Sequence, residues 1–212
     1  MEAVERIEQE LMGKTIDLYL LDRDRTALVI VDMVVGFVYS GALSSPRVAA
    51  IANNVAELNE KTKGLKKLFF LDNHEKDSQE FRYFPAHCIK GTEEAELIPE
   101  LKTKITEDSN IYYFEKNSSN GFHSKGFQNW LKKYENEVDN YIIIGCVTDI
   151  CVLQFALSLK SYFNEKNENK RIIVPENCVA TYDGGSHDGY LMHLFALYNM
   201  HVSGIEIVEK IN

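Results

Sequence analysis

The chain has few prolines, few cysteines and a single tryptophan among its 212 residues. Four cysteines are too sparse for a disulfide-stabilised scaffold. No apolar run approaches the roughly 18–20 residues that a membrane-spanning helix needs, so we expect no membrane partner. Basic residues number 23 against 32 acidic ones, and the net charge of −9 argues against the basic surface of a nucleic-acid-binding protein.

The composition is that of a globular protein. The fractions of 45% hydrophobic and 26% charged residues exclude a disordered or fibrous chain, and the length suits one domain. Residues 1–12 are acidic and amphipathic, without the basic and apolar regions of a signal peptide. We therefore expect a cytoplasmic protein with free thiols.

Short apolar runs alternate with segments of helical periodicity. The runs are 26–32, 67–72, 111–114, 141–146, 171–175 and 204–208. Continuous apolar runs are typical of strands covered on both faces, as in a parallel sheet. The helical segments are 45–64, 148–162 and 188–199. This alternation predicts an α/β fold, three-layer α/β/α with a mostly parallel sheet. We place a single domain at 26–212, after an N-terminal extension at 1–25 that we expect to be helical.

Two acids and a thiol stand at the ends of predicted strands. Asp32, Asp72 and Cys146 each close an apolar run. Ligands of open parallel sheets bind outside the carboxyl ends of the strands. The sequence therefore predicts a ligand-binding site at the edge of the sheet where these strands end.

The segment from Gly145 to Cys151 reads as a strand-to-helix turn, with Cys151 in the first helical turn. A helix N-terminus lowers the pKa of a thiol and offers N–H groups to an oxyanion. Cys151 is thus a candidate nucleophile, and a buried packing cysteine is the alternative. A redox pair of Cys146 and Cys151 is a further alternative, although the spacing is not CxxC.

A second group of candidates is Asp72, His74, Glu80 and His87. Asp72 and His74 stand two residues apart, so they share one side of an extended segment. Mixed nitrogen and oxygen ligands suit zinc, iron or manganese. A solvated polar loop is the alternative. Lys116 follows the run 111–114, and it is either a surface residue or a cation that stabilises a thiolate.

Together these segments resemble the isochorismatase-like cysteine hydrolases, and within them the nicotinamidases. The resemblance covers about residues 26–208. It rests on four blocks: 29–33 with Phe37, Asp72-Asn-His74 with Glu80 and 84–92, Phe114-Glu-Lys116, and 145–151.

The resemblance implies a role for each candidate residue. Cys151, Asp32 and Lys116 would form a catalytic triad, with Asp32 taking the thiol proton. The N–H groups of Val147 and Cys151 would form an oxyanion hole beside a cis Val147–Thr148 peptide. One divalent metal ion, zinc by preference and iron or manganese otherwise, would bind Asp72, His74 and His87, with Glu80 as a fourth ligand. Phe37 and Phe84 would contact the substrate.

The implied reaction is hydrolysis of nicotinamide to nicotinate and ammonia through a cysteine thioester. Two departures concern the substrate: many nicotinamidases have tryptophan at the position of Phe84, and a tyrosine where residues 118–120 are Ser-Ser-Asn. Another amide is therefore the alternative substrate. Isochorismatases that cleave a vinyl ether lack the nucleophilic cysteine, so Cys151 argues against that reaction. The expected partners are a small-molecule amide and further copies of the chain in a homo-oligomer.

Overall fold

The longest apolar runs pair in parallel at the centre of the protein. The computed structural model describes residues 2–11, 13–102 and 110–212. The main sheet has the order β4-β3-β2-β5-β6-β8, with β7 beside β5, and all of its pairings are parallel. Its strands are β2 (Thr26–Val31), β3 (Lys66–Asp72), β4 (Ile111–Lys116), β5 (Asn140–Cys146), β6 (Arg171–Pro175), β7 (Val179–Ala180) and β8 (Glu206–Val208).

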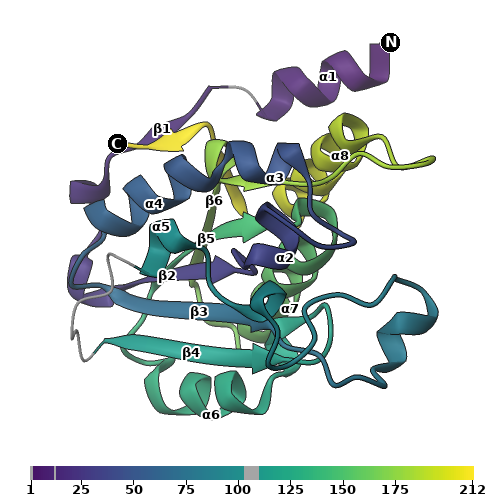
Figure 1. Cartoon of the computed structure of the whole chain (residues 1–212). Helices are drawn as coiled ribbons and strands as arrows, with labels where there is room; N and C mark the ends of the chain where they lie inside the picture. Colours follow the sequence, from purple (N-terminus) through teal and green to yellow (C-terminus); the bar gives the residue numbers. More distant parts are fainter. Residues whose placement is uncertain (1, 12, 103–109) are drawn as a thin grey trace.

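Helices cover both faces of this sheet (Figure 1). Alternate strand residues point to opposite faces: Leu28 and Ile30 belong to one buried cluster, and Val29 and Val31 to the other. The first cluster lies beneath α2 (Val35–Val38), α3 (Pro46–Ala50), α4 (Ala52–Lys61) and α5 (Pro99–Lys102). The second lies beneath α6 (Lys125–Tyr134), α7 (Leu153–Glu165) and α8 (Gly189–Val202). The predicted three-layer α/β/α fold is confirmed.

The helices differ in detail from the sequence prediction. Ser45 caps α3 through its side chain and Pro46 is the first helical residue, as predicted. The segment 45–64, predicted as one helix, is divided at Ile51, where the backbone bonds to Val48 in a tighter turn. α6 has no counterpart in the prediction.

The N-terminal segment contacts elements near the other end of the chain. The helix α1 (Glu2–Leu11) packs against α8, and Leu11 is buried in the second cluster. Farther along, β1 (Thr15–Ile16) pairs in parallel with β9 (Lys210–Ile211). No helix in the described ranges is long and apolar enough to cross a membrane.

The carboxyl ends of β2, β3, β4 and β5 lie on the same side of the protein, at the right of Figure 1. The long connection from β3 to α5 extends from that side. This arrangement places Asp32, Asp72, Lys116 and Cys146 at one edge of the sheet, as the sequence predicts.

Candidate active site

Asp32 directly follows β2 and is fully buried. Its backbone has φ of 51°, a conformation that few residues other than glycine adopt. Two bonds hold this backbone: the Asp32 N–H donates to Phe70 O at 3.0 Å, and the Cys146 thiol donates to Asp32 O at 3.0 Å. Both neighbouring strands therefore fix the position of the carboxylate.

Lys116 is the last residue of β4, and its ammonium group lies between two buried carboxylates. Its Nζ is 2.8 Å from Asp32 Oδ2 and also contacts Asp72 Oδ1. It donates to the backbone oxygen of Ser118 at 3.1 Å. The Sγ atom of Cys151 lies 3.9 Å from the same Nζ. One cation thus contacts both aspartates and the thiol.

Burial and the shared ammonium give the two carboxyl groups opposite pKa shifts. Burial raises the pKa of Asp32 to about 7; the attraction of Lys116 opposes this effect, and the charge of Asp72 adds to it. Burial also disfavours the charged form of Asp72, but Lys116, His74 and His87 outweigh it and lower the pKa of Asp72. Asp72 is therefore an anion at neutral pH, while Asp32 can gain or lose a proton there.

Cys151 lies in a single π-helical turn, Thr148–Val152, that precedes α7. Burial raises the pKa of the Cys151 thiol well above its usual value, although Lys116 acts in the opposite direction. The prediction that a helix N-terminus lowers this pKa is therefore wrong, because desolvation of the thiolate is the larger effect. A protonated thiol at rest needs a nearby base, and the carboxylates of Asp32 and Asp72 lie within 4.8 Å of Sγ.

Asp72, His74 and His87 bring three buried ligand atoms within 4.8 Å of one another. His74 Nε2 is 3.4 Å from Asp72 Oδ1, and His87 Nε2 is 3.6 Å from Asp72 Oδ2. His87 Nδ1 donates to Pro85 O at 2.8 Å, which leaves Nε2 free to act as a ligand.

The environment of His74 also fits a cation. Its Nδ1 lies 3.3 Å from Asn117 Oδ1, so this bond turns Nε2 toward Asp72. Nε2 is buried without a hydrogen-bond partner in the described part of the chain. An unpaired buried nitrogen is unfavourable unless a ligand occupies it. The donor set of two imidazoles and a carboxylate suits zinc, iron or manganese.

Glu80, the fourth predicted ligand, lies at the margin of this group. Its Oε2 is 3.9 Å from His74 Nε2, and its Oε1 accepts a bond from the Ser119 N–H at 2.6 Å. Its side chain thus connects the metal-ligand candidates to the segment that follows β4.

Asp72, Glu80, His87 and Cys151 line one pocket, with about 420 Å³ of free space including its mouth. Phe37 and Phe84 are part of its wall, and their rings lie 5.5 and 6.3 Å from the His87 ring. The lining residues are Phe37, Leu43, Asp72, Glu80, Phe84, His87, Ser119, Val147, Ile150, Cys151 and Tyr182.

Several contributors were not predicted from the sequence. Leu43, Ser119, Ile150 and Tyr182 line the pocket. Ser119 and Ile150 stand within three residues of Lys116 and Cys151, and this proximity could have identified them. Leu43 and Tyr182 have no such signal. The Phe81 ring packs against both His74 and His87 and was also missed.

The turn that carries Cys151 contains a cis peptide bond, but its position differs from the expectation. The cis bond joins Cys146 and Val147, one residue before the predicted Val147–Thr148 bond. β5 remains paired with β7 through Cys146, which is the last residue of the strand.

The arrangement can perform nucleophilic chemistry in a largely apolar pocket. It combines a buried thiol, a carboxylate with a raised pKa and an ammonium that contacts both. Such a set can transfer the thiol proton to the carboxylate as sulfur attacks an electrophilic carbon.

A family model described as the isochorismatase domain matches residues 26–206. The chain belongs to the isochorismatase family. Nicotinamidase 1 of Arabidopsis thaliana is 32% identical over 91% of this chain and 89% of that relative. This isochorismatase-family protein is an amidohydrolase.

Solved structures show the same fold. The nicotinamidase PncA of Bacillus subtilis has a TM-score of 0.74 and 26% identity, over 87% of this chain and 99% of the other. The pyrazinamidase of Pyrococcus horikoshii, solved in complex with zinc, has a TM-score of 0.69 and 24% identity, over 87% and 99%. At that identity, the second likeness concerns the fold alone.

Proposed function

We propose that this protein is a metal-containing nicotinamidase, which hydrolyses nicotinamide to nicotinate and ammonia through a thioester on Cys151. One observation carries the proposal: the Lys116 ammonium contacts Asp32 and Asp72 and lies 3.9 Å from Cys151 Sγ, beside the buried His74 and His87. A nucleophile and a candidate metal group therefore share one pocket.

The pocket suits a flat aromatic amide. Phe37 and Phe84 offer ring surface near His87. Asp72, His74 and His87 would hold one divalent cation, with Glu80 as a fourth ligand, and the bound cation would fix the pyridine nitrogen of the substrate. Zinc is our first choice of metal, with iron or manganese as alternatives.

Acylation of Cys151 requires a proton acceptor and an oxyanion hole. Asp32 takes the thiol proton as Sγ attacks the amide carbon. The backbone N–H groups of Val147 and Cys151 bind the oxyanion that forms. Asp32 then gives its proton to the departing amino group, the carbon–nitrogen bond breaks, and ammonia leaves.

Deacylation uses the same groups, with water in place of the thiol as the attacking nucleophile. The Asp32 carboxylate takes a proton from water as the oxygen attacks the thioester carbon. The carbon–sulfur bond breaks, the proton held by Asp32 returns to sulfur, and the carboxylic acid leaves and releases its proton to solvent as nicotinate. Lys116 stays protonated in both halves, because two carboxylates raise its pKa despite burial.

A redox function for Cys146 and Cys151 receives less support. Cys146 belongs to the buried cluster on one face of the sheet and Cys151 to the cluster on the other. Both are free thiols, and the Cys146 thiol is bonded to Asp32 O. Pairing them would require the end of β5 to rearrange. Another small amide remains the second candidate substrate.

The test is a steady-state assay of ammonia release from nicotinamide, pyrazinamide and carbamoyl compounds by metal-loaded protein. We expect nicotinamide to be turned over and Cys151→Ala to abolish turnover while metal content is unchanged. Cys178→Ala, which alters a buried thiol outside the pocket, is the matched control. Full activity of Cys151→Ala would refute the mechanism, and turnover of another amide alone would refute the substrate.

A further inference from the structure

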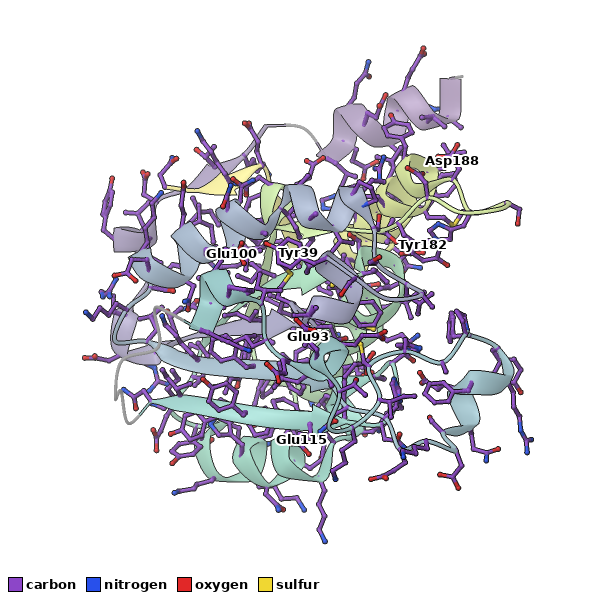
Figure 2. The ribbon with its side chains drawn as sticks, viewed as in Figure 1. Tyr39, Glu93, Glu100, Glu115, Tyr182 and Asp188 are labelled. Atoms are coloured by element: carbon purple, nitrogen blue, oxygen red, sulfur yellow. The ribbon has the colours of Figure 1, made fainter. Side chains whose placement is uncertain are left out.

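One wall of the pocket comes from a segment that the mechanism does not use. Tyr182 lies in the connection between β7 and α8, and Figure 2 shows it on the side of the molecule where the strands end. The His187 ring lies face to face with the Tyr182 ring: the ring centroids are 4.0 Å apart and the planes differ by 6°. Tyr182 thus lines the pocket while an imidazole stacks on its ring.

Hydrogen bonds fix the position of this imidazole. His187 Nε2 is 2.7 Å from Asp149 Oδ2, and Nδ1 is 2.9 Å from Tyr182 O. A carboxylate oxygen lies at one ring nitrogen and a carbonyl oxygen at the other, so the ring is held from both sides. The imidazole is therefore fixed over the face of the Tyr182 ring.

The same bonds connect the wall to the nucleophile. Asp149 lies in the π-helical turn that carries Cys151, two residues before it. The connection itself is a closed turn, because Gly184 and His187 exchange backbone bonds of 3.1 and 2.8 Å. The Asp183 carboxylate accepts a further bond from the Gly189 N–H at 2.7 Å. The ring of Tyr182 is therefore held at a fixed place relative to Sγ.

The other aromatic rings that line the pocket, those of Phe37 and Phe84, lie near His87. Ser119 contributes a small polar side chain to the wall. Tyr182 adds an aromatic ring to this pocket from a different element, the connection between β7 and α8. We propose that Tyr182 determines the selectivity of the pocket for aromatic amides, with His187 and Asp149 as positioning residues. The inference rests on the proposed function, because it assumes that an aromatic ring reaches Cys151.

The test compares the alkylation of Cys151 by phenacyl bromide and by iodoacetamide. In both reactions sulfur bonds to the CH₂ carbon, halide leaves, and the thiol proton passes to the base. The rate ratio of the two reagents, divided by the same ratio for glutathione, measures the preference for an aromatic ring. We expect wild type to prefer phenacyl bromide and Tyr182→Ala to lose about tenfold of that preference, in line with one lost stacking contact.

Matched variants separate stacking from folding. Tyr182→Phe should restore the preference, and Tyr19→Ala, at a tyrosine that is 79% exposed, should leave it unchanged. His187→Ala should give an intermediate ratio. An unchanged ratio in a folded Tyr182→Ala protein would overturn the proposal.

Steady-state kinetics distinguish this proposal from the proposed function. If wild type hydrolyses nicotinamide, Tyr182→Ala should raise KM about tenfold with a smaller change in kcat. If wild type does not act on nicotinamide, the proposed function fails, and the alkylation ratio still decides whether Tyr182 selects aromatic rings.

Discussion

The ammonium of Lys116 lies 2.8 Å from Asp32 Oδ2, and both side chains are almost completely shielded from solvent. An ion pair of this kind would ordinarily keep the carboxylate charged to low pH. Here burial, together with the nearby charge of Asp72, raises the pKa of Asp32 to about 7. The contact therefore keeps the base near Cys151 without making it too weak to accept a proton.

The pH dependence of catalysis should follow Asp32. The carboxylate form accepts the thiol proton, so kcat/KM should fall as the pH decreases through about 7, by about tenfold per unit well below it. Asp32→Asn should lose this dependence together with most of the activity. Measurements between pH 5 and 9 on protein with an unchanged circular dichroism spectrum would check this. A flat profile over that range would show that Asp32 is not the base.

Lys116→Met should destabilise the protein strongly. The substitution leaves the carboxylates of Asp32 and Asp72 buried together without their cation, and breaking a buried ion pair costs about 3–5 kcal/mol. The free energy of unfolding in urea measures the loss. Lys102→Met, which removes a surface cation paired with Glu96, should change it by less than about 1 kcal/mol. Equal stabilities of the two variants would contradict the role of Lys116.

Metal affinity should depend on Asn117, although it is not a proposed ligand. Asn117 Oδ1 orients the His74 ring, and loss of such a partner weakens metal binding by about 10–100-fold. Competition of the Asn117→Ala protein with a chelating dye would measure this. His74→Ala should abolish specific binding, and His201→Ala, at a half-buried histidine outside the pocket, should leave the affinity unchanged. Wild-type affinity in Asn117→Ala would exclude the orienting role.

Gly145→Ala should prevent normal folding. Gly145 lies opposite Val31 in the sheet, and a Cβ atom there would be 2.0 Å from Val31 O. We expect a loss of more than about 4 kcal/mol in the free energy of unfolding. Gly64→Ala is the control, because Gly64 also has positive φ but has no atom within 4 Å of the added Cβ. Its loss should be about 1–3 kcal/mol, from backbone strain alone. Similar losses in the two variants would argue against the steric explanation.

The sequence predicted the sheet well, because each central strand is a continuous apolar run that ends at a polar residue or thiol. Asp32, Asp72 and Lys116 could be placed at one edge by the rule for parallel strands alone. Asp72 and His74 are also close enough in the sequence to suggest that both bind the same metal ion.

Features that depend on contacts between distant segments were not predictable. The pKa of Cys151 was predicted in the wrong direction, because its burial depends on packing that a local reading of the turn does not include. Tyr182 was missed because it follows a two-residue strand, too short to recognise.

The helix α6, in contrast, could have been predicted from the sequence. Ser124 caps it, and Phe127, Trp130 and Leu131 form its buried face.

The sheet separates two sets of buried side chains, and Ile150 packs against both. Substitutions on opposite faces and far from this residue should change stability additively, since they share no neighbours. Ile150 also lines the pocket. Near the pocket, a substitution on one face of the sheet can therefore alter the effect on stability of a substitution on the other face. Double-mutant cycles across the sheet should show coupling there.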